Sequence, residues 1–85
     1  GTAQASRVGV LNGLSLDDVV RVEVIQLNTR GDGDSTVVTD FTLRLHSRHG
    51  HHADWHDAYQ RGHEHAVVTF LAWVDALNAK LADRT

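Results

Sequence analysis

The sequence predicts an α+β fold, in which a small antiparallel sheet of two long strands and one or two short ones is packed by a C-terminal amphipathic helix. Residues 19–27 and 36–46 are rich in β-branched side chains and alternate between apolar and polar types, as half-buried strands do. From about His63 to Asp83 the apolar residues instead recur with the helical period. A chain of 85 residues has the length of one domain, so we expect residues 1–85 to form a single small domain.

The segment before the first long strand is expected to be largely irregular. Residues 1–6 are small and polar, and we expect them to be disordered or left over from cloning. Residues 7–11 alternate briefly and are interpreted as an edge strand, which an Asn12-Gly13 turn follows. Residues 15–18 either cap one helical turn or lead directly into the first long strand. The chain contains no Met, so we expect a processed form or a piece of a longer protein.

The first long strand changes its apolar face part-way along. Val20, Val22 and Val24 share one face, whereas Ile25 and Leu27 lie on the other. Two hypotheses explain the change. Either a β-bulge near Val24 and Ile25 re-aims the strand, or protein covers both faces of the sheet.

The second long strand, at 36–46, has the clearest alternation in the chain. A loop at 28–35 precedes it, and we expect the two long strands to form a hairpin. Residues 53–59 follow as either a third short strand or a helical turn. One face of the second strand is predicted to be apolar and consists of Val37, Thr39, Phe41, Leu43 and Leu45. The other is predicted to be polar and consists of Val38, Asp40, Thr42, Arg44 and His46.

The C-terminal helix is predicted to lay one apolar stripe against the sheet. The stripe consists of Phe70, Val74, Leu77 and Leu81, and His63 lies at its centre as a core histidine. The central core is therefore expected to consist of Phe41, Leu43, Phe70, Val74 and Leu77.

The opposite helix face is also nearly apolar, and we identify it as a candidate interface. It consists of Val68, Ala72, Ala76 and Ala79. Alanine is the best helix former, so these residues are equally compatible with solvent. The alternative is that a second helix packs there, from a second copy or another protein. We expect a homodimer through this face, with pairing of the strand at 36–46 across a dimer axis as a competing route.

All seven histidines lie between His46 and His65, and three hypotheses explain the cluster. A zinc or nickel site would take His49, His51, His52 and His56 as ligands, possibly with Asp54. A pH switch is the second, since imidazole titrates near pH 6.5 and full protonation would add seven charges. Under the third hypothesis, the histidines are structural residues of loops and strand rims.

The composition excludes several classes of function. Eight Lys and Arg against eleven Asp and Glu leave a net charge of −3, which provides no basic field for nucleic acid. No apolar run approaches the roughly 18 residues that a membrane span requires. The chain has no Cys, hence no thiolate nucleophile, and this fits any compartment, with the cytoplasm slightly favoured.

We therefore expect a non-catalytic interaction or assembly domain that acts by homodimerisation or by docking on a protein partner. No serine-nucleophile motif and no phosphate-binding glycine loop is present, so an enzyme is not expected. No cofactor is expected either, apart from zinc or nickel in the alternative, a His-rich metal-binding or pH-responsive module.

Overall fold

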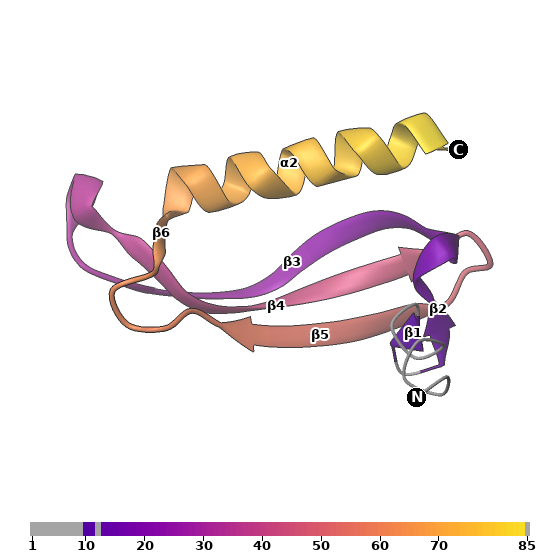
Figure 1. The fold of residues 1–85 in the computed structure, drawn as a ribbon, viewed down its shortest axis with the longest axis horizontal. Helices are drawn as coiled ribbons and strands as arrows, with labels where there is room; N and C mark the ends of the chain where they lie inside the picture. Colours follow the sequence, from indigo (N-terminus) through magenta and orange to yellow (C-terminus); the bar gives the residue numbers. More distant parts are fainter. Residues whose placement is uncertain (1–9, 12, 85) are drawn as a thin grey trace.

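Three antiparallel strands and one long helix form the body of the molecule (Figure 1). The computed structural model describes residues 10–11 and 13–84. The strands β3 (Val19–Arg30), β4 (Val37–Ser47) and β5 (His52–Ala58) lie side by side in that order. The helix α2 (Val67–Arg84) runs along one face of this sheet, after the short strand β6 (His65–Ala66), which also pairs with β4. The predicted α+β fold class is confirmed.

A small hairpin precedes the sheet. It joins β1 (Val10–Leu11) to β2 (Leu14–Ser15) around Gly13, whose φ of 82° is a conformation that glycine adopts without strain. The predicted edge strand at 7–11 is thus seen for its last two residues, and the expectations for residues 1–6 fall outside the described part of the chain. The predicted helical turn is the 3-10 turn η1 (Leu16–Asp18), in which Ser15 makes no side-chain cap.

The β3–β4 hairpin contains the predicted bulge. The pairing shifts between Val24 and Gln26, so that Ile25 is the extra residue and its side chain is exposed. The shift brings Val24 and Leu27 to the same packed side as the buried Val22. The hypothesis of a bulge is confirmed, and it explains why the apolar period of the first strand breaks.

A second irregularity corrects the predicted faces of β4. Residues 41, 43 and 45 point into the core as expected, but Val38 is also buried, at 0% exposure. Asn28 pairs with Asp40 while Thr29 pairs with Val38, so Thr39 is an extra residue that reverses the alternation. The assignment of Val38 to the polar face was therefore wrong.

The connection between the long strands is shorter than the predicted 28–35 loop, because β3 continues to Arg30. It contains the 3-10 turn η2 (Gly33–Ser35). Gly31 has a φ of 107°, and a Cβ atom there would lie 2.6 Å from the Ser35 carbonyl oxygen, so only glycine fits.

The start of the helix was predicted too early. Residues 53–59 belong largely to strand β5, but α2 begins at Val67 rather than near His63. His63 lies exposed in a turn, so its assignment to the core was wrong. The physical reason is tertiary pairing. β6 pairs with β4 beyond the point where the pairing of β5 with β4 ends. This pairing holds the chain extended up to Ala66.

The core lies between α2 and the sheet. Phe41, Leu43, Phe70 and Val74 are buried as predicted, and Leu77 is half-buried against them. The helix packs mainly over β3 and also contacts β4 and β6. A helix is about 10 Å across and strands are about 4.8 Å apart, so one helix covers roughly two strands. The strip above β5 consequently lies beside the helix rather than under it.

Candidate functional site

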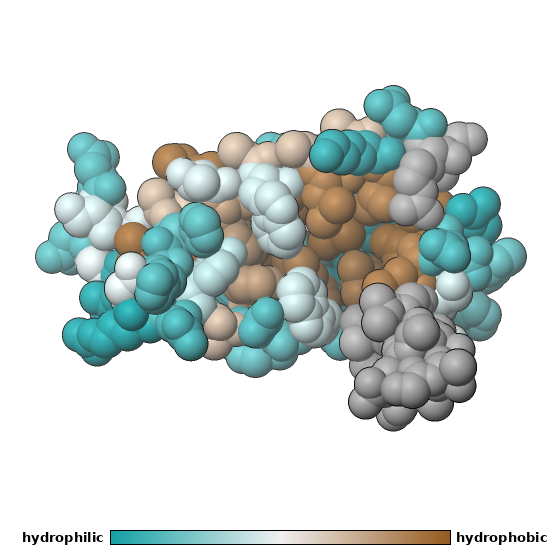
Figure 2. Space-filling model, in the orientation of Figure 1, coloured by the Kyte–Doolittle hydropathy of each residue, from teal (hydrophilic) through white to brown (hydrophobic). Residues whose placement is uncertain are grey.

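The strip between α2 and β5 is the candidate site, and it is lined by aromatic rings. In Figure 2, apolar residues gather on this side of the molecule between the helix and β5. Trp55 on β5 is 37% exposed, and Trp73 on α2 is 45% exposed. We call the strip bounded by Trp55, Tyr59 and Trp73 the aromatic groove. Tryptophan and tyrosine are the residues that most often carry binding energy at protein interfaces.

The rings of the groove belong to one cluster centred on Phe41. The Phe41 ring centroid lies 5.8 Å from that of Trp55, 5.5 Å from that of Tyr59 and 4.9 Å from that of Phe70. Phe70 in turn lies 5.8 Å from Trp73. These five residues are all the Trp, Tyr and Phe of the chain. Two of them form the core, and the others extend it outward to the surface.

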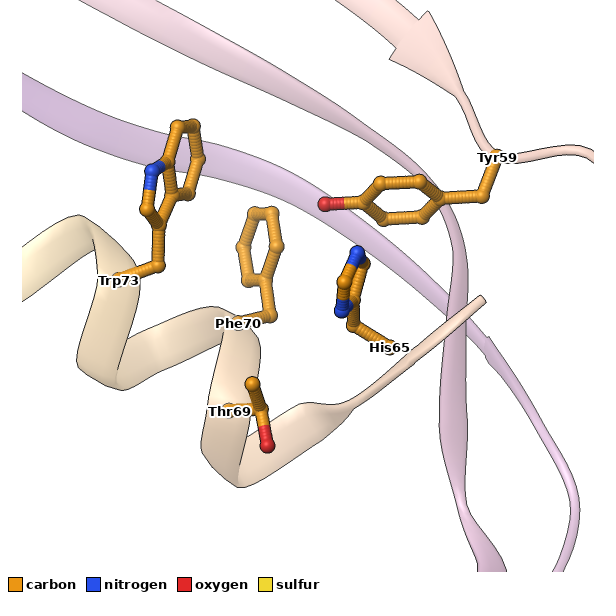
Figure 3. A pocket seen from close by; sticks show the side chains of 5 residues that line it. All are labelled: Tyr59, His65, Thr69, Phe70 and Trp73. Atoms are coloured by element: carbon orange, nitrogen blue, oxygen red, sulfur yellow. The ribbon is translucent and has the colours of Figure 1, made fainter. Parts of the chain in front are cut away.

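The groove deepens next to β6. A hollow of about 340 Å³ is lined by Tyr59, His65, Thr69, Phe70 and Trp73. Figure 3 shows the Tyr59 ring reaching across from the end of β5 toward Phe70, with His65 beside it. The Tyr59 and His65 ring centroids are 4.9 Å apart, nearly edge to face. Partial burial, and to a lesser extent the charge of Asp57, raise the pKa of the Tyr59 hydroxyl.

The turn below the hollow is fixed by Glu64. Its carboxylate accepts hydrogen bonds from the Gly62 backbone N–H and from Arg30 at the tip of the β3–β4 hairpin. A hydrogen bond with its own backbone amide, then those from Arg30 and Gly62, lower the pKa of the carboxyl. Glu64 precedes the helix instead of belonging to its first turn, and it ties the hairpin to the entry of α2.

The opposite face of the sheet is polar and is crossed by rows of paired side chains. Arg44 donates two hydrogen bonds to Asp54, at 2.8 and 3.1 Å, across β4 and β5. These bonds lower the pKa of Asp54 and raise that of Arg44. His46 Nε2 lies 2.9 Å from Glu23 Oε1 and, by that contact, lowers the pKa of Glu23. His56 lies in the next row, with Nδ1 2.9 Å from Thr42 Oγ1.

The two outer edges of the sheet differ. Along the β3 edge, Asn78 of α2 accepts a hydrogen bond from the Val22 backbone N–H at 2.7 Å and donates one to the Val22 carbonyl at 2.9 Å. One side chain thus occupies the backbone groups that an additional strand would need. On the β5 edge, the described residues form no further strand. The competing dimer route through the strand at 36–46 was wrong, because β4 lies between β3 and β5 and has no free edge along their pairing.

The predicted interface residues lie where the helical period placed them. Val68, Ala72, Ala76 and Ala79 are all exposed on the outer side of α2, and Val68 is 77% exposed. A shallow hollow of about 260 Å³ touches this face at Val68 and continues over the η2 turn. Exposure alone does not identify a partner, so this interface stays a prediction.

The four predicted metal ligands are not brought together. His52 and His56 lie on one strand, where four residues span about 13 Å, rather than on the helix that their spacing required. His49 lies in the β4–β5 turn, 3.7 Å from Asp18, and His51 is exposed beside it. Within residues 10–11 and 13–84, no three His, Asp or Glu side chains form a group that could hold a metal ion.

The aromatic groove was missed from the sequence, because Trp55, Tyr59 and Trp73 are separated by strands, a turn and part of a helix. Trp55 was a usable signal. It lies between the polar residues Asp54 and His56, yet it points to the same side of the strand as the apolar Ala53.

Comparisons with known proteins give no match, so the function is inferred from the geometry of the site. Neither a protein-family model nor a curated protein or a solved structure matches the chain. In the part of the chain that the structure describes, no helix has the length and apolar character to cross a membrane.

Proposed function

We propose that the chain is a non-catalytic assembly domain that forms a homodimer through the aromatic groove and the adjoining edge of β5. The observation that carries this proposal is the half-covered sheet. The helix covers β3 and β4, while Trp55 and Trp73 stand exposed on either side of the strip above β5. Large exposed rings next to an apolar strip are typical of a protein-binding surface.

A protein partner fits this surface better than a small molecule does. The hollow is open along the groove, and the polar side-chain groups of its lining are the hydroxyls of Tyr59 and Thr69, the ring of His65 and the indole N–H of Trp73. Small-molecule sites usually enclose their ligand and fix it with several converging polar groups. The groove instead continues along β5, which favours an extended contact with another polypeptide.

Light scattering on the full chain tests the proposal directly. We expect a concentration-dependent mass that reaches twice 9.4 kDa. Trp73→Ser removes an exposed ring from the groove and should raise the dissociation constant at least about thirtyfold, the effect typical of an interface hot spot. Val68→Ser is the matched control, because it removes an exposed apolar side chain from the outer helix face.

The control also separates the two possible interfaces. If Val68→Ser and Ala72→Glu dissociate the dimer while Trp73→Ser does not, the outer helix face is the interface and the groove is excluded. A chain that stays at 9.4 kDa at millimolar concentration would refute homodimerisation altogether.

A further inference from the structure

We propose that the second copy adds its own β5 strand antiparallel to this one, around a two-fold axis that passes through Trp55 perpendicular to the sheet. The inference rests on the proposed function and specifies its geometry. The β3–β4–β5 sheets of the two copies become one continuous sheet, and both α2 helices lie on the same face of it.

The backbone of β5 alternates in the way that such pairing requires. Ser47 N–H donates to the His51 carbonyl at 2.7 Å, and Tyr59 N–H donates to the Thr39 carbonyl at 3.0 Å. The odd-numbered residues between them therefore form the hydrogen-bonded pairs with β4, and the even-numbered residues direct their backbone groups away from it. His52 and His56 thus present N–H and C=O groups to a strand added at this edge.

Only a few registers are compatible with two-fold symmetry. The axis keeps both helices on one face, so each residue must meet one that points to the same side of the sheet. An axis through Asp54 would place two Asp54 carboxylates directly opposite each other, which is destabilising. An axis through His56 would oppose two histidines and place Trp55 against Asp57 of the second copy.

An axis through Trp55 makes the polar face self-complementary. Asp54 then lies opposite His56 of the second copy, and His56 lies opposite Asp54 of the second copy. Within one copy, Glu23 is paired with Arg44, and Arg44 with Asp54. Adding His56 of the second copy continues this row with alternating charge whenever the imidazole is protonated. Asp54 keeps its two hydrogen bonds with Arg44 in this arrangement.

The same register fills the gap above the joined strands. Trp55 meets Trp55 of the second copy at a non-hydrogen-bonded position, where side chains approach most closely. The strip above the two β5 strands is about 10 Å wide, and each copy contributes Trp55 and Trp73 to it. The exposed rings thereby become the centre of a core that two helices and one sheet enclose.

The other sheet edge does not offer this geometry. Two register shifts place an extra residue on β3, and Asn78 occupies the Val22 backbone groups. The β5 ladder with β4 runs from His52 to Ala58 with no shift. At its end, the Asp57 carboxylate accepts a hydrogen bond from the Ala58 N–H, which marks the limit of the ladder that a second copy would extend.

Single-cysteine cross-linking tests the register, since the chain has no Cys of its own. Across the axis, the Cα atoms of residue 55 would be about 4.5 Å apart, which a disulfide spans. Mild oxidation of Trp55→Cys should thus give a covalent dimer. Because this change removes a groove ring, a mixture of Asp54→Cys and His56→Cys keeps Trp55 and should cross-link faster than either protein alone.

Asp57→Cys is the control, because its counterpart in the second copy would be displaced by four residues, or about 13 Å along the strand. Equal cross-linking of all these proteins, or none in a chain that light scattering shows to be dimeric, would overturn the β5 register and leave the proposed function standing. A monomeric wild type would overturn both.

Discussion

The β3 and β5 edges belong to one sheet, yet they differ in the regularity of their strand pairing and in whether a side chain covers their backbone groups. Two register shifts place an extra residue on β3, and Asn78 occupies the backbone groups of Val22. The β5 edge has an unbroken ladder and carries Trp55 beside a groove that the helix leaves uncovered. Bulges and side-chain caps are the means by which proteins prevent strands from adding to an edge. β3 carries both features and the β5 ladder carries no shift, which is why the proposed dimer uses the β5 edge.

The largest expected effect separates the core side of α2 from its groove side. Phe70 is 1% exposed, so Phe70→Ala should lower the free energy of unfolding by about 3–5 kcal/mol. Against a total of about 5–10 kcal/mol for a small domain, this is enough to unfold much of the protein. Trp73→Ala, one turn away, should cost far less stability but weaken dimerisation. Chemical denaturation at low protein concentration measures both, and an unchanged midpoint for Phe70→Ala would remove that residue from the core.

The next effect concerns the β3 edge. Asn78→Ala leaves the part-buried N–H and C=O of Val22 without their side-chain partner, and we expect a loss of about 1–3 kcal/mol. Hydrogen exchange at the Val22 amide should accelerate in parallel. Asn28→Ala is the control, because Asn28 makes its 2.6 Å hydrogen bond to Asp40 on the exposed face and should cost under about 0.5 kcal/mol. Equal costs for the two variants would contradict the assigned role of Asn78.

A smaller effect concerns charge at the β5 edge. His56→Asp would place two pairs of like charges across the proposed axis, and we expect roughly tenfold weaker dimerisation. His56→Lys keeps a positive charge opposite Asp54 and should dimerise at least as well as the wild type. Sedimentation velocity measures both constants, and equal weakening by the two substitutions would argue against a contact between residues 54 and 56.

The smallest effect is the acid dependence of the exposed ion pairs. Arg44 lowers the pKa of Asp54, so this pair stabilises the fold above the ordinary carboxyl pKa and loses its contribution as the pH falls through the lowered value. Glu23 behaves likewise beside His46. Arg44→Gln should therefore flatten the decline in stability between about pH 5 and pH 3, most clearly at low salt. A decline as steep as that of the wild type would show that Asp54 gains nothing from Arg44.

The sequence predicted the fold from local patterns and failed where distant segments decide the structure. The alternation at 41–45 and the helical stripe from Phe70 to Leu81 were sufficient for the sheet, the helix and the core. The start of α2 could not be predicted, because β6 is extended only through its pairing with β4. The groove could not be predicted either, because Trp55 and Trp73 are brought to one strip by a helix that covers two of three strands.

Amide hydrogen exchange on the wild-type chain, followed by NMR as a function of protein concentration, tests the central claim most directly. The His52 and His56 amides point away from β4, so they should exchange rapidly in dilute protein and slow as the dimer forms. The Trp55 amide is bonded within the sheet and should be protected at every concentration. If His52 and His56 exchange at a constant rate while the measured mass doubles, the copies do not meet at β5 and the account is wrong.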